Sequence, residues 1–446
     1  MKEFLKIVFG LAFPIALQNL INTGVTTADV VMLGKVGEAA LSSGSLAGQV
    51  QFIMNLMVFG LSSGAAVLSS QYWGKKEIVT IEKILGMALC FSVTAGICFF
   101  AVVKLFPWQI MHIFSSEPEI IEGGVSYLKL VAYSYPMSAF TTGYLYLMRS
   151  VERVKIGTVV FGCSLILNVI LNAVFIFGVG AVPAMGVRGA ALATLMSRCF
   201  ELVFVLVFIF KINREVRIRP AYFFRFDPVL LKDFLVLSIP VVLNETLWGA
   251  GMSANAAILG QMGSAAAAAN SVVRVIRELV MVMSMGLSAA AGVLVGKALG
   301  AGDRKLAETC AARMVGLSVF VTSIASLVMF LLRHSIADML TLGDEAKEYL
   351  VFMLTILAFY SLCQSVSCPV IVGVLRGGGD TRFGLILESG SLWLGSIMLG
   401  AIGAFVLKLP VKAVFLLLML DEFIKLPFSI WRYRSKIWVK DLTRSS

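Results

Sequence analysis

The residues with the clearest chemical potential in this sequence are polar side chains set inside long apolar stretches. Asp29 lies in one such stretch. Asn168 and Asn172 lie four residues apart in another, so their amides share one face of a helix. Thr194 lies near the start of the next stretch. A carboxylate, two amide carbonyls and a hydroxyl are hard oxygen ligands of the kind that small cations prefer, so this set predicts a cation site.

The apolar stretches that carry these residues are long enough to cross a membrane. The chain is 446 residues long, 59% hydrophobic and only 14% charged, whereas an ordinary soluble domain has about 25% charged residues. Stretches of about 20 apolar residues recur along it, which is the length of a helix that spans the hydrocarbon core. Because they are continuous rather than alternating, we expect helices and not the strands of a barrel.

The pattern predicts an all-α integral membrane protein with twelve transmembrane helices. The expected spans lie near residues 9–33, 46–71, 84–105, 124–148, 157–180, 187–211, 234–259, 271–298, 313–332, 349–375, 383–407 and 410–432. Lysines and arginines gather at the span ends on one side, and the positive-inside rule then places both termini in the cytoplasm and the protein in the plasma (inner) membrane. We therefore attribute the net charge of +11 to basic residues that set the membrane orientation. We expect no nucleic-acid partner.

The sequence also repeats itself with an offset of 226 residues. Several short identities align without a gap: Pro14 with Pro240, Gly60-Leu61-Ser62 with Gly286-Leu287-Ser288, and Gly74 with Gly300. The basic connection 212–233 separates the two copies, which predicts an N-lobe over 1–211 and a C-lobe over 234–446. An even number of spans in each copy gives both copies the same orientation.

Two parallel copies predict two six-helix bundles related by a pseudo-two-fold axis along the membrane normal. In transporters this arrangement places a cavity between the halves, and rocking of the halves opens it to each side in turn. Pro14 and Pro240 occupy equivalent points of the first and seventh spans. Proline kinks a helix, so we interpret the pair either as static kinks or as gating hinges.

Helix counting brings the candidate cation ligands to similar depths. Asp29 lies about 12 Å outward from the middle of its span at the usual rise per residue. Asn172 and Thr194 also fall in the outer half, and Asn168 lies near the middle. The alternatives are an interfacial aspartate and asparagines that only join helices. With a proton as the ion, Asp29 would carry it; with Na⁺, all four residues could coordinate it.

A second candidate site lies in the C-terminal half. Glu245 is almost at the midpoint of the span 234–259, and acids inside a membrane are functional hypotheses by default. Its repeat equivalent is Asn19, and the alignment places three further residues nearby: Asn22, Asn244 and Trp248. A cationic amphipathic ligand could stack on Trp248 and pair with Glu245. The alternative is a structural acid satisfied by a neighbouring helix.

Arg274 and Arg277 lie in the next span, and we interpret them in two ways. Long basic side chains can extend to the membrane interface without any function. Alternatively, they could form an ion pair with Glu245 or contact an anionic ligand. The sequence leaves both interpretations open.

Four stretches resemble motifs of the multidrug and toxic compound extrusion (MATE) family, within the MOP flippase superfamily. They occur in the expected order: Asp29–Gly37, Gly186–Thr194, Leu375–Thr381 (LRGGGDT) and Asp421–Trp438. The resemblance implies an antiporter that exports cationic or amphipathic drugs or metabolites in exchange for Na⁺ or H⁺. It also implies a coupling site at the positions of Asp29, Asn168, Asn172 and Thr194. The chain departs from some members in lacking a carboxylate on the tenth span, where it has Ser365 and Ser367.

Two other classes are weaker. A flippase-like transporter of a lipid-linked or anionic substrate should carry several intramembrane cations, and only the two arginines of the eighth span are strong candidates. An enzyme is not expected, because no HExxH or P-loop motif is present. We therefore expect no catalytic residues and no cofactor besides the coupling ion. The expected partners are a small-molecule substrate and the lipid bilayer, and we expect a monomer.

Overall fold

The sequence folds into helices joined by short turns. The computed structural model describes residues 2–180, 182–340 and 342–444. The first half contains α1 (Lys2–Gly34), α2 (Glu38–Lys75), α3 (Ile78–Leu105), α4 (Pro107–Phe114), α5 (Pro118–Val131), α6 (Ser134–Ser150), α7 (Lys155–Phe177), α8 (Val187–Val207), η1 (Phe208–Ile212) and η2 (Pro220–Phe223). The second half contains α9 (Pro228–Gln261), α10 (Ser264–Gly300), α11 (Arg304–Asp338), α12 (Asp344–Cys368), η3 (Pro369–Leu375), α13 (Thr381–Gly390), η4 (Ser391–Ile397), α14 (Met398–Ala401), η5 (Ile402–Val406), α15 (Val411–Leu418) and α16 (Leu420–Arg434).

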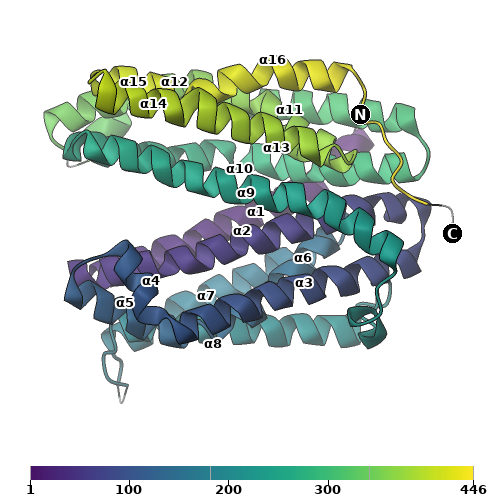
Figure 1. The fold of residues 1–446 in the computed structure, drawn as a ribbon, viewed down its shortest axis with the longest axis horizontal. Coiled ribbons are helices and arrows are strands. Elements are labelled where there is room, and N and C mark those ends of the chain that lie inside the picture. The colour runs from purple at the N-terminus through teal and green to yellow at the C-terminus, as the bar shows by residue number, and fades with distance from the viewer. Residues whose placement is uncertain (1, 181, 341, 445–446) are drawn as a thin grey trace. The chain divides into compact units, whose positions relative to one another are not determined.

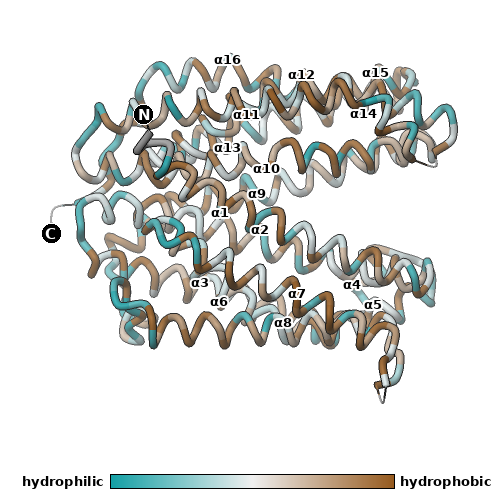
Figure 2. The backbone as a smooth tube through the Cα atoms, turned by 180° about the vertical axis from the view of Figure 1, so that it is seen from behind, coloured by the Kyte–Doolittle hydropathy of each residue, from teal (hydrophilic) through white to brown (hydrophobic). Residues whose placement is uncertain are grey.

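The predicted membrane-spanning character is confirmed. Within the described part of the chain, nine helices are long and apolar enough to cross a membrane. The three other expected spans correspond to α5 with α6, to α9, and to α15 with α16. In Figure 2 apolar colour runs along the helices, and polar colour gathers at helix ends and turns.

The expected span 124–148 is divided in two, for a reason visible in the sequence. Helix α5 ends at Val131 and α6 begins at Ser134, with a turn at 132–133. Pro136 has no backbone N–H to donate to the carbonyl four residues earlier, so the helical ladder is interrupted there. The last span is likewise divided, between Leu418 and Leu420.

The chain forms two compact units, and three helices contribute to both. The first unit comprises Met1–Ala16, Ser70–Lys76 and Leu243–Ser446, and the second comprises Leu17–Ser69 and Glu77–Val242. The boundaries after Ala16 and Val242 are equivalent under the offset of the repeat, and each falls two residues after a helix proline, Pro14 or Pro240. The prolines thus mark where α1 and α9 pass from one unit to the other. Division into lobes at the 212–233 connection stays a prediction.

In the second unit, α2 packs closely against the start of α9. A Cβ atom on Gly60 would lie 2.6 Å from Val242 Cα, and one on Gly64 would overlap the side chain of Ser238. Helices α3 and α6 also pack together, as do α7 and α8. Small side chains at such crossings let the helix backbones approach closely, as is common in membrane proteins.

In the first unit, α10 to α13 and α16 pack together (Figure 1, green to yellow), and the start of α1 packs on α10. A Cβ atom on Gly286 would lie 2.6 Å from Ala12 O. Gly286 is the repeat equivalent of Gly60, so the α1–α10 contact in this unit repeats the α9–α2 contact of the other unit. The close approach explains why both copies have glycine here.

A further pair of equivalent glycines joins the end of α2 to the end of α10 within the first unit. A Cβ atom on Gly74 would overlap the carbonyl oxygen of Lys297, and one on Gly300 would overlap the carbonyl oxygen of Gln71. Each glycine therefore packs against the backbone of the partner helix, and no larger residue fits at either position without a shift of that backbone.

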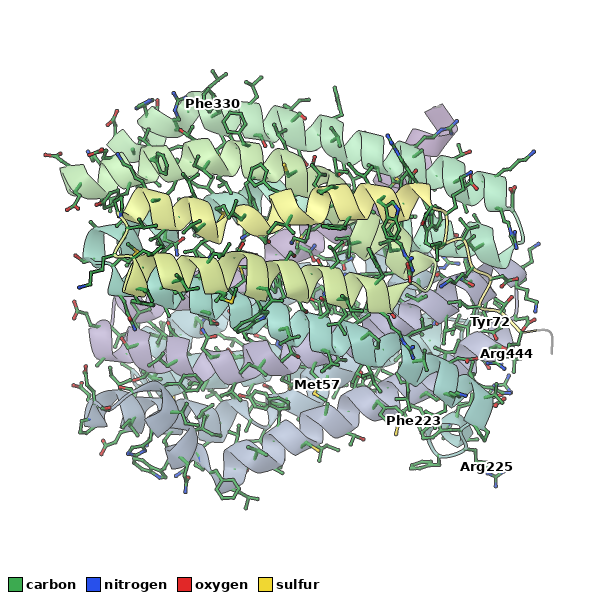
Figure 3. All side chains as sticks on the ribbon, turned by 45° about the horizontal axis from the view of Figure 1, so that its top comes forward. Met57, Tyr72, Phe223, Arg225, Phe330 and Arg444 are labelled. Atoms are coloured by element: carbon green, nitrogen blue, oxygen red, sulfur yellow. The ribbon has the colours of Figure 1, made fainter. Side chains whose placement is uncertain are left out.

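The C-terminal segment binds at the same end of α2. Tyr72 Oη accepts a hydrogen bond from Arg444 N at 3.3 Å, and Figure 3 shows the two residues side by side. Gln71 Nε2 donates to Gly377 O at 3.1 Å, and Gln71 Oε1 accepts from Leu442 N at 2.7 Å. These contacts tie the LRGGGDT turn and the C-terminal segment to α2.

We expect Gly300→Ala to destabilise the protein by about 2 kcal/mol or more, because the added methyl meets a backbone carbonyl that cannot rotate away. Gly316→Ala is the control. It lies inside α11 with nothing within 4 Å of its Cβ position, and it should stabilise by about 0.5–1 kcal/mol. Thermal unfolding in detergent measures both. Equal effects of the two variants would contradict the close approach.

Candidate functional site

Three of the four residues predicted as a cation site contact one another, within the second unit. Asn172 Nδ2 donates to Asp29 Oδ1 at 2.5 Å and to Asn168 Oδ1 at 3.1 Å. These contacts place α1 beside α7, and the four-residue spacing of the asparagines puts both amides on one face. Asn172 is fully buried, and Asn168 and Thr194 are nearly so.

Asn172 Oδ1 is buried without a hydrogen-bond partner among the described residues. Thr194 Oγ1 is also buried and lies beside the Tyr127 hydroxyl. The orientation of the Asn172 amide follows from its neighbour: an ionised carboxylate only accepts hydrogen bonds, so the NH₂ group must face Asp29. Its carbonyl oxygen is left as a free acceptor. A buried acceptor without a partner costs free energy, and a bound cation would remove that cost.

The structure adds three residues that sequence reasoning missed. Arg198 lies one helical turn after Thr194 on α8 and donates to both carboxylate oxygens of Glu201, at 2.7 and 2.9 Å. It also interacts electrostatically with Asp29. Tyr127 of α5 is buried close to Thr194 and Asp29. The signal in the sequence was an arginine and an acid three residues apart within an apolar stretch, which is costly unless the two are paired.

Glu245 is paired with a basic residue of another helix that the sequence analysis did not name. Arg376 Nη2 lies 2.7 Å from Glu245 Oε1, and both side chains are largely buried. Arg376 follows η3 in the LRGGGDT turn, far from Glu245 in the chain. Arg277 instead donates to Tyr360 Oη at 3.1 Å, and Arg274 is exposed. The ion pair considered for Glu245 with Arg274 or Arg277 is therefore corrected, because Glu245 forms it with Arg376.

Arg376 is shared with a second acid, Glu388 of α13, at 3.7 Å. Glu388 Oε2 also accepts a hydrogen bond from Asn244 Nδ2. Sequence reasoning missed Glu388, although an acid inside the expected span 383–407 was a signal for it. Arg376 therefore interacts with two carboxylates, those of Glu245 and Glu388.

A second buried charge cluster lies on α16. Lys425 Nζ lies 2.6 Å from a carboxylate oxygen of Glu422 and 3.0 Å from one of Asp421. Tyr360 Oη donates to Asp421 at 3.3 Å, and the guanidinium of Arg277 lies 4.9 Å from the centre of the Tyr360 ring. Arg277 is therefore part of this cluster.

A small cavity adjoins both charge clusters. Its lining residues come from α9, α13 with η4, and α16: Asn244, Trp248, Glu388, Ser389, Leu392 and Lys425. Asn244 and Trp248 were predicted from the sequence as substrate contacts near Glu245, and both line this cavity. Asn19 and Asn22 belong to the other unit, and their contribution to a substrate site stays a prediction.

Two π-helical segments adjoin the cavity region, since Arg376 follows η3 and Leu392 lies in η4. Such segments are rare and are frequent at functional sites. No group of three or more histidine, cysteine, aspartate or glutamate side chains arranged to hold a metal ion occurs in the described residues. Oxygen donors and paired charges suit alkali cations, protons and organic cations better than soft transition metals.

Comparison with known proteins shows which family has this architecture. The MatE family model matches the chain twice, over residues 14–174 and 240–402. The chain belongs to the MATE transporter family. The two matches begin at Pro14 and Pro240, the residues that open the alignment of the internal repeat. As a MATE protein the chain is a multi-pass membrane transporter and not an enzyme, and it is an exporter of this family.

Two relatives and one solved structure show how far the likeness to MATE proteins extends. The probable multidrug resistance protein YoeA of Bacillus subtilis (strain 168) is 20% identical over 85% of this chain and 82% of its own length. The probable multidrug resistance protein NorM of Rhodopseudomonas palustris is 26% identical over 86% and 82%. A MOP superfamily transporter from Pyrococcus furiosus, described as having a binding pocket of reverse polarity, matches with a TM-score of 0.88 at 18% identity, over 97% of this chain and 95% of its own. The structural match confirms the predicted fold class.

We expect Arg376→Gln to destabilise this MATE protein by about 3–5 kcal/mol, because it leaves Glu245 and Glu388 buried without their cation. Glu245→Gln in the same protein should recover part of the loss. Arg153→Gln is the control, since its ion pair with Glu215 is exposed and should contribute about 1 kcal/mol or less. Thermal unfolding in detergent is the measurement. A double variant no more stable than Arg376→Gln would contradict the pairing.

Proposed function

We propose that this protein is a secondary antiporter that exports cationic or amphipathic compounds in exchange for an inward-moving monovalent cation bound at Asp29. The observation that carries the proposal is the buried contact of Asp29 with Asn172, whose carbonyl oxygen has no hydrogen-bond partner among the described residues. Asn168 and Thr194 complete the oxygen set. The names of the multidrug resistance proteins YoeA and NorM support drug-like substrates.

The charges around Asp29 favour one monovalent cation at this site. With Asp29, Glu201 and Arg198 all ionised, the group has one excess negative charge. An excess charge is costly in a membrane interior, and a single Na⁺ or H⁺ would neutralise it. Na⁺ could bind Asn172 Oδ1 directly, and a proton on Asp29 could be donated to the same oxygen once the amide turns over, so the site suits either ion.

The substrate region is proposed to lie around Glu245, Asn244 and Trp248 in the first unit. The Trp248 ring offers a stacking surface for an organic cation. Glu245 is already paired with Arg376, so a cationic substrate would have to compete with that arginine. A flippase-like transporter of anionic substrates is less favoured, because Arg376 and Lys425 are themselves held by carboxylates.

Asp29→Asn should abolish ion-driven efflux with little effect on folding, because it keeps the side-chain volume and removes the carboxylate that binds Asn172. Loss of an interaction with a charged group corresponds to about 1.5–3 kcal/mol, so cation binding should weaken by about 10- to 150-fold. Dye efflux from vesicles under separately imposed Na⁺ and H⁺ gradients measures the effect. Asp338→Asn, at an exposed position on α11, is the control. Wild-type rates from Asp29→Asn vesicles would place the coupling site elsewhere.

The membrane orientation provides a separate test. Glu117 and Arg217 are both exposed, and cytoplasmic termini would place Glu117 outside and Arg217 inside. In a protein whose native cysteines are replaced, Glu117→Cys should react with an impermeant thiol reagent added to intact cells. Arg217→Cys should react only after the cells are opened. The reversed pattern would reverse the orientation.

A further inference from the structure

The basic connection between the two copies of the repeat, residues 212–233, packs on α3 within the second unit. Glu82 of α3 is buried, and its carboxylate lies 2.8 Å from Arg219 Nε. One helical turn later, a Cβ atom on Gly86 would lie 2.7 Å from Tyr222 O, so the backbone of η2 lies directly against the helix. These contacts fix where the side chains of the connection lie along α3.

The aromatic part of the connection, residues 222–226 (YFFRF), lies at the depth where the membrane begins. The Phe226 ring stacks on the Phe91 ring of α3, with the ring centres 6.1 Å apart. Phe91 lies about two helical turns beyond Ile84, where the third span is expected to begin, which corresponds to about 10 Å along the helix. Because the segment contacts α3 at both Gly86 and Phe91, it runs along the edge of the hydrocarbon core.

Two neighbouring residues of this segment point away from the protein. Phe224 is 86% exposed, more than any other large hydrophobic side chain in the described residues. Arg225 is also exposed, and Figure 3 shows it at the edge of the ribbon. A phenylalanine ring exposed to this extent is unfavourable in water. At the boundary between headgroups and acyl chains it is favourable, and apolar side chains of interfacial segments insert there.

The connection also has positive charge that no acid of the described chain neutralises. Three of its arginines are exposed and form no ion pair with a described residue: Arg214, Arg217 and Arg225. Arg219 is paired with Glu82, and Glu215 is paired with Arg153. Asp227 accepts hydrogen bonds from backbone amides at the start of α9. The three arginines are therefore available to an external anion.

An anionic phospholipid has the chemistry that fits an exposed phenylalanine beside an arginine at this depth. A guanidinium group presents its N–H donors in one plane and binds phosphate oxygens with two parallel hydrogen bonds. The acyl chains of the same lipid would cover the neighbouring ring. Free phosphate could satisfy Arg225 but would leave Phe224 in water, so it fits the pair less well.

We propose that Phe224 and Arg225 form an interfacial site for an anionic phospholipid, with the charges of Arg214 and Arg217 increasing the attraction. The predicted orientation of the protein places this site in the cytoplasmic leaflet. A bound lipid would hold the connection between the two copies of the repeat at the membrane surface. The site is independent of the ion and the substrate proposed above, because lipid binding can be measured without transport.

The first test measures the melting temperature of the full-length protein in detergent micelles, because a ligand that binds the folded state stabilises it. Phosphatidylglycerol should raise the melting temperature by about 2 °C or more above its value with the same mole fraction of phosphatidylcholine. Arg225→Gln should raise the mole fraction of phosphatidylglycerol that gives half of this shift. The increase should be about five-fold, which corresponds to the roughly 1 kcal/mol that one basic residue contributes near an anionic surface.

Arg304→Gln is the matched control. Arg304 is an exposed arginine at the start of α11 in the other unit, and it forms no ion pair with a described residue. The variant removes the same charge and should leave the half-shift mole fraction unchanged. Sodium phosphate at constant ionic strength should give no shift. A phosphate shift that Arg225→Gln abolishes would mean that the arginine binds a soluble anion, which would overturn the lipid site.

A second test measures depth and does not depend on how Arg225→Gln folds. In protein whose native cysteines are replaced, a spin label on Phe224→Cys is examined in liposomes that contain phosphatidylglycerol. The label should collide more with oxygen, which concentrates in lipid, than with a water-soluble nickel chelate. A label on Glu117→Cys, at an exposed position between α4 and α5, should show the reverse preference.

Three results would each overturn the proposal. Equal melting temperatures with the two lipids would mean that the protein does not distinguish an anionic headgroup. An unchanged half-shift mole fraction in Arg225→Gln would place the lipid elsewhere. A label at position 224 that prefers the nickel chelate would place the ring in water. None of these results bears on ion-driven efflux from vesicles, so failure of this site and failure of the proposed function remain distinguishable.

Discussion

Asp29, Glu245 and Glu388 are carboxylates set in helices whose surroundings are otherwise apolar, and the cost of burying their charge is the constraint that shapes this protein. Each has a specific partner: the Asn172 amide for Asp29, the Arg376 guanidinium for Glu245, and the Asn244 amide for Glu388. Partners come from helices far apart in the sequence. The need to supply them therefore fixes which helices must lie together, namely α1 with α7 in one unit, and α9 with η3 and α13 in the other.

The two copies of the repeat share a scaffold and differ in charge. Gly60 and Gly286 make equivalent close contacts, with α9 in one unit and with α1 in the other. In this later part of the repeat the offset is 227, which aligns Arg149 with Arg376. Arg149 donates to the neutral Gln18 amide at 2.5 Å, whereas Arg376 binds an acid. Backbone packing tolerates few changes at such crossings. A polar side chain that faces the interior can be replaced when its partner is replaced as well. The two copies therefore differ in their buried polar residues.

Family membership and chemistry are therefore supported by different parts of the chain. The fold follows from the apolar spans, the glycine crossings and the equivalent prolines, which fit the MatE model in both halves. Relatives at 20–26% identity share that scaffold. Which ion and which substrate are carried depends on a handful of buried polar residues, and a shared fold does not fix these.

The sequence alone determined the membrane environment, the helical class and the duplication, because composition, span length and the 226-residue offset are properties of the chain itself. It also identified Asp29, Asn168 and Asn172, since polar residues are rare enough in apolar spans to stand out. Tertiary structure decided the partners. In the sequence, Arg376 stood out only as part of a turn, and no partner was evident for Glu388 in its span. In the structure Arg376 pairs with Glu245, and Glu388 accepts a hydrogen bond from Asn244. Helix periodicity predicts the depth of a residue in the membrane and the helix face on which it lies. Packing between helices decides which faces meet. A long side chain such as arginine can also pair with an acid that lies at a different depth on another helix.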